Sequence, residues 1–228
     1  MNLADSMKKI LKNPGQNVFT DFWKEDVKTI LLDVGRDIAQ MAKSSAGSFR
    51  DFKKNGIKIT AKEMYESAAD TLLIFKVLPG RVKEGFSNFK VQLVQELEGQ
   101  PDQKQKTIFS LKVIGALTSF TLGAFYSIKR GKTDFSFKGL RRRNAITQFI
   151  VAELVFKLSQ VFIHRFLTEL EKEVSDPEDL KNVRYFKELI SDRSKADIEI
   201  EGEPAAEGDR AIEIVETLKH FIMTGKKI

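Results

Sequence analysis

A stretch of 22 residues with a single charged side chain most constrains the fold of this chain. Lys112 is the only charge in residues 107–128, and the other side chains are apolar or uncharged. About 20 predominantly apolar residues suffice for a helix to cross a bilayer. Lys112 at mid-depth would cost about 2.5–3.5 kcal/mol, however, and each strongly apolar side chain gains only about 0.5 kcal/mol. The balance is near zero, so a buried core helix explains the stretch as well as a membrane span.

This apolar stretch runs directly into a strongly basic segment, residues 129–143. One acid, Asp134, stands there against seven cations: Lys129, Arg130, Lys132, Lys138, Arg141, Arg142 and Arg143. The net charge of +6 equals the formal charge of the whole chain. Such clusters attract anionic lipid by about 1 kcal/mol per residue, and they also bind nucleic acid by neutralising phosphates. No nucleic-acid-binding module is recognisable, so an anionic membrane surface is the preferred partner and nucleic acid the less favoured one.

A second apolar helix is predicted for residues 144–174. Its polar members recur at three- and four-residue steps and form one narrow stripe: Glu153, Lys157, Gln160 and His164. A helix with this pattern is mostly buried, with one edge in water. The two apolar helices therefore predict a central hairpin, residues 107–174. Because the second helix is too polar to be a good span, conditional or peripheral membrane association is favoured over a permanent anchor.

Small residues recur every four positions in the first helix of this hairpin, at Gly115, Ser119 and Gly123. Residues four apart lie on one helix face, and small side chains there let another helix approach closely. We therefore predict a helix-packing groove at these three residues, at the contact between the two helices of the hairpin.

Helical periodicity covers most of the remaining chain. Further helices are predicted for residues 3–12, for a stripe from Phe19 to Met41, for the segments before and after Pro79-Gly80, for a helix that begins at Ser175-Asp176-Pro177 and ends near Ser191, and for residues 209–223. Pro79-Gly80 is expected to end a helix, because proline lacks the N–H that a helix interior needs. The predicted fold is all-α, a seven- to eight-helix bundle in which amphipathic helices wrap the central apolar hairpin. The 18 phenylalanines favour a Phe-rich core over side chains that enter a bilayer interface.

The expected organisation has three parts. Residues 1–191 form the helical bundle, residues 192–210 form an acidic linker, and residues 211–228 form a C-terminal amphipathic helix. The linker assignment depends on its acidic composition and on Gly202, Pro204 and Gly208.

No motif for catalysis, cofactor binding or metal binding is recognisable. The chain has no cysteine and two histidines, His164 and His220, and neither has a glutamate three residues before it. The phosphate-binding loop, the His-Glu-x-x-His pattern and the Gly-x-Ser-x-Gly elbow are missing from the sequence. We therefore expect a non-enzymatic protein with no catalytic residue, no cofactor and no metal.

The expected function is membrane association inside the cell. Residues 1–15 lack the continuous apolar core of a secretory signal, so a cytoplasmic location is expected. The basic segment would dock on anionic lipid, and the lysines of residues 3–12 would add a second contact with the interface. Two alternatives remain open: a soluble helical module that binds a protein partner, and a helical carrier of a lipid or another apolar ligand.

Overall fold

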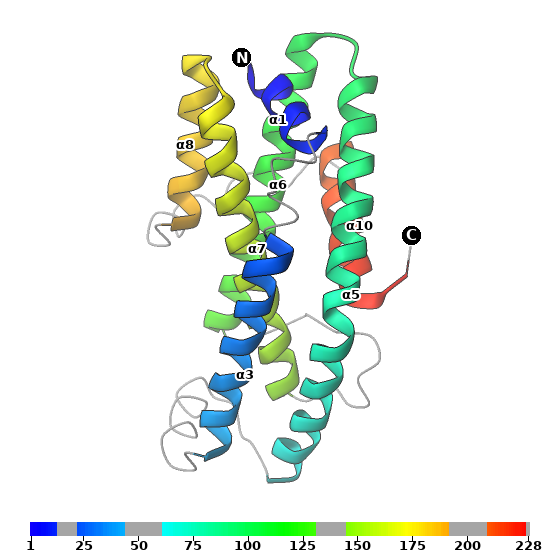
Figure 1. Cartoon of the computed structure of the whole chain (residues 1–228), viewed down its shortest axis with the longest axis vertical. Coiled ribbons are helices and arrows are strands. Elements are labelled where there is room, and N and C mark those ends of the chain that lie inside the picture. The colour runs from blue at the N-terminus through cyan, green and yellow to red at the C-terminus, as the bar shows by residue number, and fades with distance from the viewer. Residues whose placement is uncertain (13–21, 44–60, 131–144, 192–208, 227–228) are drawn as a thin grey trace.

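The computed structural model describes residues 1–12, 22–43, 61–130, 145–191 and 209–226 (Figure 1). Within these ranges the chain forms helices and no strand, which confirms the predicted all-α class. The elements in chain order are α1 (Leu3–Lys12), the π-helix η1 (Phe22–Val27), α3 (Lys28–Lys43), α5 (Ala61–Gly99), α6 (Gln103–Arg130), α7 (Ala145–Glu173), α8 (Pro177–Ser191) and α10 (Arg210–Thr224). Nearly all of the predicted linker, residues 192–210, lies outside the described residues.

The helices form an elongated assembly in which α5, α6 and α7 run along the long axis (Figure 1). Helix α6 contacts α7, and α7 also contacts α8, α3, α5 and α1. Helix α10 lies against both α5 and α6. The turn from α5 to α6 and the turn from α7 to α8 lie at the upper end of the view, whereas α3 ends and α5 begins at the lower end.

Phenylalanine side chains from three elements meet inside the assembly, as the Phe-rich core predicts. The Phe162 ring lies 5.3 Å from the Phe22 ring and 4.2 Å from the Phe86 ring, measured between centroids. It also stacks on Phe166 at 6.1 Å. Phe162 is only 1% exposed. Because these rings come from η1, α5 and α7, the cluster joins segments that are far apart in the sequence.

The predicted helix end at Pro79-Gly80 is wrong. Helix α5 continues from Ala61 to Gly99 with Pro79 inside it. An interior proline costs about 3 kcal/mol, because it removes one helical hydrogen bond and crowds the preceding turn. The compensating feature is one unbroken buried stripe on both sides of the proline: Ile74, Leu78, Val82, Phe86, Phe89, Leu93 and Leu97. Burial along this stripe favours one long helix over two short ones.

The predicted helix start at Ser175-Asp176-Pro177 is confirmed. Helix α8 begins at Pro177, and the Asp176 carboxylate accepts hydrogen bonds from the backbone N–H groups of Glu178 and Asp179, at 3.0 and 3.1 Å. The buried Asp179 carboxylate accepts in turn from the backbone N–H of Leu3, at 2.8 Å. A carboxylate at this position accepts a hydrogen bond from an otherwise free N–H of the first turn of α1. Its negative charge also interacts favourably with the positive end of the α1 dipole. The beginning of the chain is thereby fixed to the α7–α8 turn.

Candidate functional site

Helix α6 is the one helix in the described residues that is long and apolar enough to cross a membrane, over Gln103–Tyr126. Half of its most apolar window is nevertheless buried inside the protein. Val113, Ile114 and Leu117 are at most 3% exposed. Helix α7 contributes the fully buried Leu154 to the same core cluster. Core packing therefore accounts for much of the apolar composition that length and hydropathy alone assign to a span.

Lys112, the one charge of the apolar stretch, lies at the surface and has an acidic partner. Its Nζ is 2.5 Å from Oδ2 of Asp209, the residue that caps α10. The other carboxylate oxygen of Asp209 accepts from the backbone N–H of Ala211 at 3.1 Å. The hydrogen bond from Lys112 lowers the pKa of Asp209, partial burial opposes this, and the Ala211 N–H adds to the lowering. One carboxylate thus starts α10 and fixes it to α6.

We expect this ion pair to make stability fall at acid pH. Because the folded state lowers the pKa of Asp209, its contribution is present above the unfolded pKa of about 3.9 and is lost as the pH falls through the folded value. Asp209→Asn keeps a good cap but removes the charge, so the free energy of unfolding should depend less on pH below about 4. Urea denaturation over a pH series measures this.

Asp102→Asn is the matched control for the acid-pH experiment. Asp102 also caps a helix, since its carboxylate accepts from the backbone N–H of Gln105 at 2.8 Å, but it has no lysine partner in the described structure. An equal change of pH dependence in both variants would contradict a role for the Lys112 pair.

The three residues of the predicted packing groove have different surroundings. A Cβ atom at Gly115 would lie 3.8 Å from the ring of Phe186, which belongs to α8. Ser119 is exposed, and a Cβ at Gly123 would meet no described atom within 4 Å. The structure therefore places α8, rather than α7, next to Gly115, and it leaves Gly123 uncovered by the described helices.

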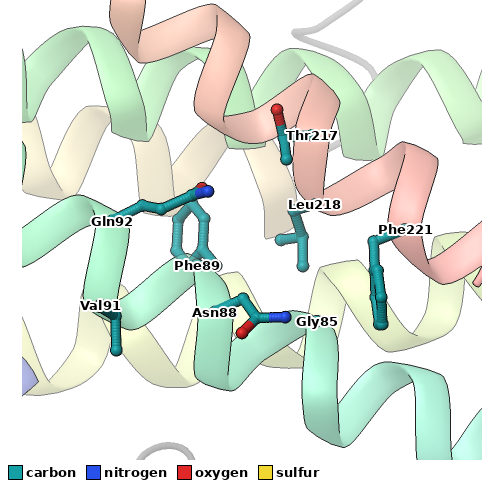
Figure 2. A pocket seen from close by; sticks show the side chains of 8 residues that line it. All are labelled: Gly85, Asn88, Phe89, Val91, Gln92, Thr217, Leu218 and Phe221. Atoms are coloured by element: carbon teal, nitrogen blue, oxygen red, sulfur yellow. The ribbon is translucent and has the colours of Figure 1, made fainter. Parts of the chain in front are cut away.

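A small-residue contact that the sequence analysis did not identify lies at Gly85. A Cβ atom there would be 3.2 Å from side-chain atoms of Leu218 and Phe221. The missing side chain therefore lets α10 approach α5 closely. Beside this contact lies an open groove of about 300 Å³ (Figure 2). Phe89, Leu218 and Phe221 line it together with the amides of Asn88 and Gln92. A glycine among apolar residues was the only sequence signal for this contact. It does not identify the partner helix α10, which begins more than 120 residues later in the chain.

A second cavity, of about 500 Å³, lies between η1, α7 and the end of α8. Arg165 binds the Asp26 carboxylate through two nitrogen atoms, at 2.8 and 3.1 Å. Glu25 also binds Arg165, at 3.3 Å. His164 and Glu169 line the same cavity. The ion pairs of Arg165 with Asp26 and Glu25 thus join η1 to α7 beside this cavity.

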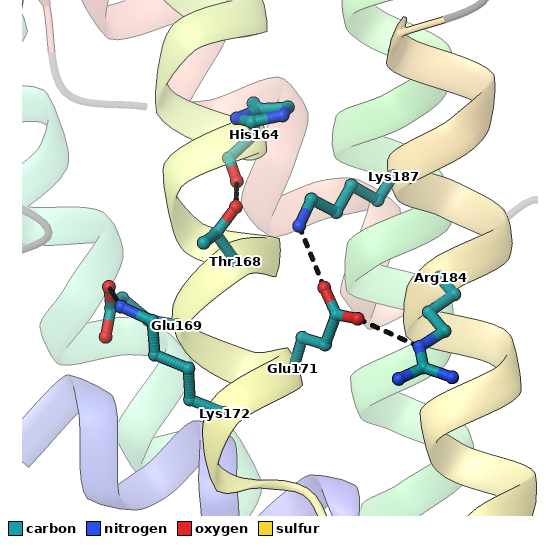
Figure 3. A network of polar contacts seen from close by, with 7 residues as sticks. All are labelled: His164, Thr168, Glu169, Glu171, Lys172, Arg184 and Lys187. Atoms are coloured by element: carbon teal, nitrogen blue, oxygen red, sulfur yellow. Dashed lines mark hydrogen bonds and ion pairs between the residues drawn. The ribbon is translucent and has the colours of Figure 1, made fainter.

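The neighbouring polar contacts of α7 are also ion pairs and backbone hydrogen bonds (Figure 3). Lys187 and Arg184 each lie 2.8 Å from the Glu171 carboxylate and lower its pKa. The hydroxyl of Thr168 donates to the carbonyl oxygen of His164. The described residues hold no group of three or more His, Cys, Asp or Glu side chains that fits a metal ion. His220 is half-buried on α10, far from His164 in the sequence.

The predicted basic segment lies mostly outside the described residues. Lys129 and Arg130 are the last residues of α6, while five of its cations fall between α6 and α7: Lys132, Lys138, Arg141, Arg142 and Arg143. The positions of its two ends are given by the described helices, since the segment joins the end of α6 to the start of α7. Helix α6 ends and α7 begins in the lower half of the assembly, where α3 also ends and α5 begins (Figure 1).

The apolar face of α1 is used inside the protein. Leu3, Met7 and Leu11 are fully buried. The three lysines of this helix have acidic partners: Lys8 and Lys12 bind Glu98, and Lys9 lies 2.5 Å from Glu173. The side chains that would form a second membrane contact are therefore engaged in the fold.

Comparisons of the chain with protein-family models, with curated proteins and with solved structures found no significant match.

Proposed function

We propose that this chain is a non-enzymatic, membrane-associated helical protein that docks on anionic lipid through the basic segment 129–143. The observation that carries the proposal is that four helix ends lie in the same half of the assembly (Figure 1). The segment with net charge +6 joins α6 to α7, and α6 ends and α7 begins in the lower half of the assembly, where α3 also ends and α5 begins. Clustered cations at one end of an elongated protein favour an oriented approach to an anionic surface.

A second basic sequence supports this orientation. Residues 44–60, which join α3 to α5, contain four cations and one acid. The described helices that these two basic sequences join, α3 to α5 and α6 to α7, have their connected ends in the same half of the assembly. Counterion screening at physiological ionic strength acts over about 8 Å, so charge concentrated at one end attracts lipid headgroups better than the same charge spread over the surface.

The burial of α6 favours docking over spanning. In the proposed architecture α6 and α7 form the central apolar hairpin, and the other helices cover it. Half of the apolar window of α6 is buried, and Lys112 is paired with Asp209 at the surface. Insertion of α6 would break that ion pair and would expose the core faces of its neighbours. The protein then associates with the cytoplasmic leaflet as a folded unit and uses no cofactor or metal.

Co-sedimentation with lipid vesicles tests the proposed function. We expect the chain to sediment with vesicles of equimolar phosphatidylcholine and phosphatidylserine at low salt, to remain in solution with pure phosphatidylcholine, and to be released by high salt. No binding to the anionic vesicles would reject the proposal and favour a soluble protein-interaction module. Equal binding to both kinds of vesicle would point to a carrier of apolar ligands, and stronger binding to duplex DNA than to the vesicles would point to nucleic acid.

A further inference from the structure

Two large apolar side chains are exposed on the helices that lead to the basic end. Leu72 of α5 is 72% exposed, and Leu32 of α3 is 53% exposed. Both belong to helices whose other apolar side chains are largely buried, such as Ile74 and Val34 at 0%. Keeping a leucine in water forgoes about 1.5–3 kcal/mol that full burial would give. The described helices leave these two side chains largely open to water.

Cations accompany both leucines on the same helix faces. Lys28 and Arg36 lie four residues before and after Leu32, and Lys76 lies four residues after Leu72. All three cations are exposed. Residues four apart are neighbours on a helix surface. Lys28 and Lys76 make no ion pair in the described structure, and Arg36 reaches only Asp33, at 3.5 Å. Each exposed leucine therefore stands beside positive charge that is largely uncompensated.

The two leucines flank one contact between α3 and α5. A Cβ atom at Gly35 would lie 3.5 Å from the ring of Phe75. Leu32 and Leu72 each precede a member of this contact by three residues, which is about one helical turn. The two helices run in opposite directions along the long axis (Figure 1), and the basic sequence 44–60 joins them in the chain. The exposed leucines thus lie on the two helices that reach the half of the assembly proposed to dock on lipid.

We infer that Leu72 and Leu32 are apolar anchors that enter the interface of an anionic bilayer while Lys28, Arg36 and Lys76 contact the lipid phosphates. This inference rests on the proposed function and assigns it a surface among the described residues. Interfacial protein segments pair leucine with lysine and arginine in this way, because the apolar side chain reaches the acyl boundary while the cations stay at headgroup level. A second copy of the chain is a poorer occupant, because it would bring the same cations against them.

Single-cysteine labelling tests the inference, and no native cysteine has to be removed first because the chain contains none. Leu72→Cys and Leu32→Cys would each carry an environment-sensitive NBD fluorophore. We expect a blue shift of its emission, and quenching by spin-labelled lipid, on adding vesicles of equimolar phosphatidylcholine and phosphatidylserine. Val91→Cys is the matched control, since Val91 is 55% exposed on the same helix toward its other end and has no charged residue three or four positions away. Its label should not shift.

The outcomes separate this inference from the proposed function. Co-sedimentation without a shift at positions 72 and 32 would overturn the anchors and leave the proposed docking intact, whereas loss of co-sedimentation would reject both. An equal shift at position 91, or a concentration-dependent shift without vesicles, would also overturn the anchors, the latter in favour of a second copy. Leu72→Ala should lower vesicle affinity by about five- to tenfold, and Val91→Ala should leave it unchanged.

Discussion

Replacing Phe162 with alanine is expected to lower the free energy of unfolding by about 3–5 kcal/mol. Phe162 is 1% exposed and contacts rings from two other elements, Phe22 at 5.3 Å and Phe86 at 4.2 Å. Truncation removes the buried apolar area of the ring. It also leaves a cavity between η1, α5 and α7 that small movements of these elements do not fill. The loss should also weaken the attachment of η1, because Phe22 is the fully buried aromatic anchor of that short segment.

Urea denaturation followed by far-UV circular dichroism measures this effect. Phe162→Leu keeps most of the volume and should cost less than about 1.5 kcal/mol. Leu72→Ala removes a side chain that is 72% exposed, so its effect should stay within about 0.5 kcal/mol. If Phe162→Ala and Leu72→Ala were equally stable, Phe162 would not occupy the core position that the structure gives it.

Helix identity could be predicted from the sequence wherever a strong local signal and the packing agree. Asp176 and Pro177 fix the start of α8 through a side-chain cap and a ring that suits the first turn, and both act within a few residues. Pro79 shows the limit of such signals. Its local preference for a helix end is outweighed by burial of Leu78 and Val82 on a stripe that continues along α5. That burial depends on helices whose position the local sequence does not specify.

The contacts between distant elements could not be predicted for the same reason. Lys112 was recognisable as an isolated charge, but its partner Asp209 lies 97 residues away and also serves as a helix cap. The spacing of Gly115 and Gly123 was visible, yet spacing alone does not specify which helix fills a face. Gly85, which has no periodic small neighbours, is instead a position where side chains of α10 approach α5 closely.

Neutralising Arg141, Arg142 and Arg143 together is expected to reduce affinity for anionic vesicles on the order of 100-fold. Each cation near an anionic surface contributes about 1 kcal/mol, so three contribute about 3 kcal/mol when all of them reach the headgroups. The three positions changed to serine lie between α6 and α7 in the chain, outside the helices that form the described core. Its thermal stability should therefore match that of the natural chain, and co-sedimentation at low salt should report binding alone.

Lys8, Lys9 and Lys12 provide a control that removes the same net charge from the opposite end. These lysines already bind the carboxylates of Glu98 and Glu173, and α1 lies at the upper end of the assembly, away from the lower ends of α3, α5 and α6. Changing all three to serine should alter vesicle affinity by less than about threefold, since paired exposed cations contribute little. Equal losses in the two triple variants would mean that net charge alone attracts the protein to lipid. A selective loss in the arginine variant would instead mean that the protein docks by the end where α6 passes into α7.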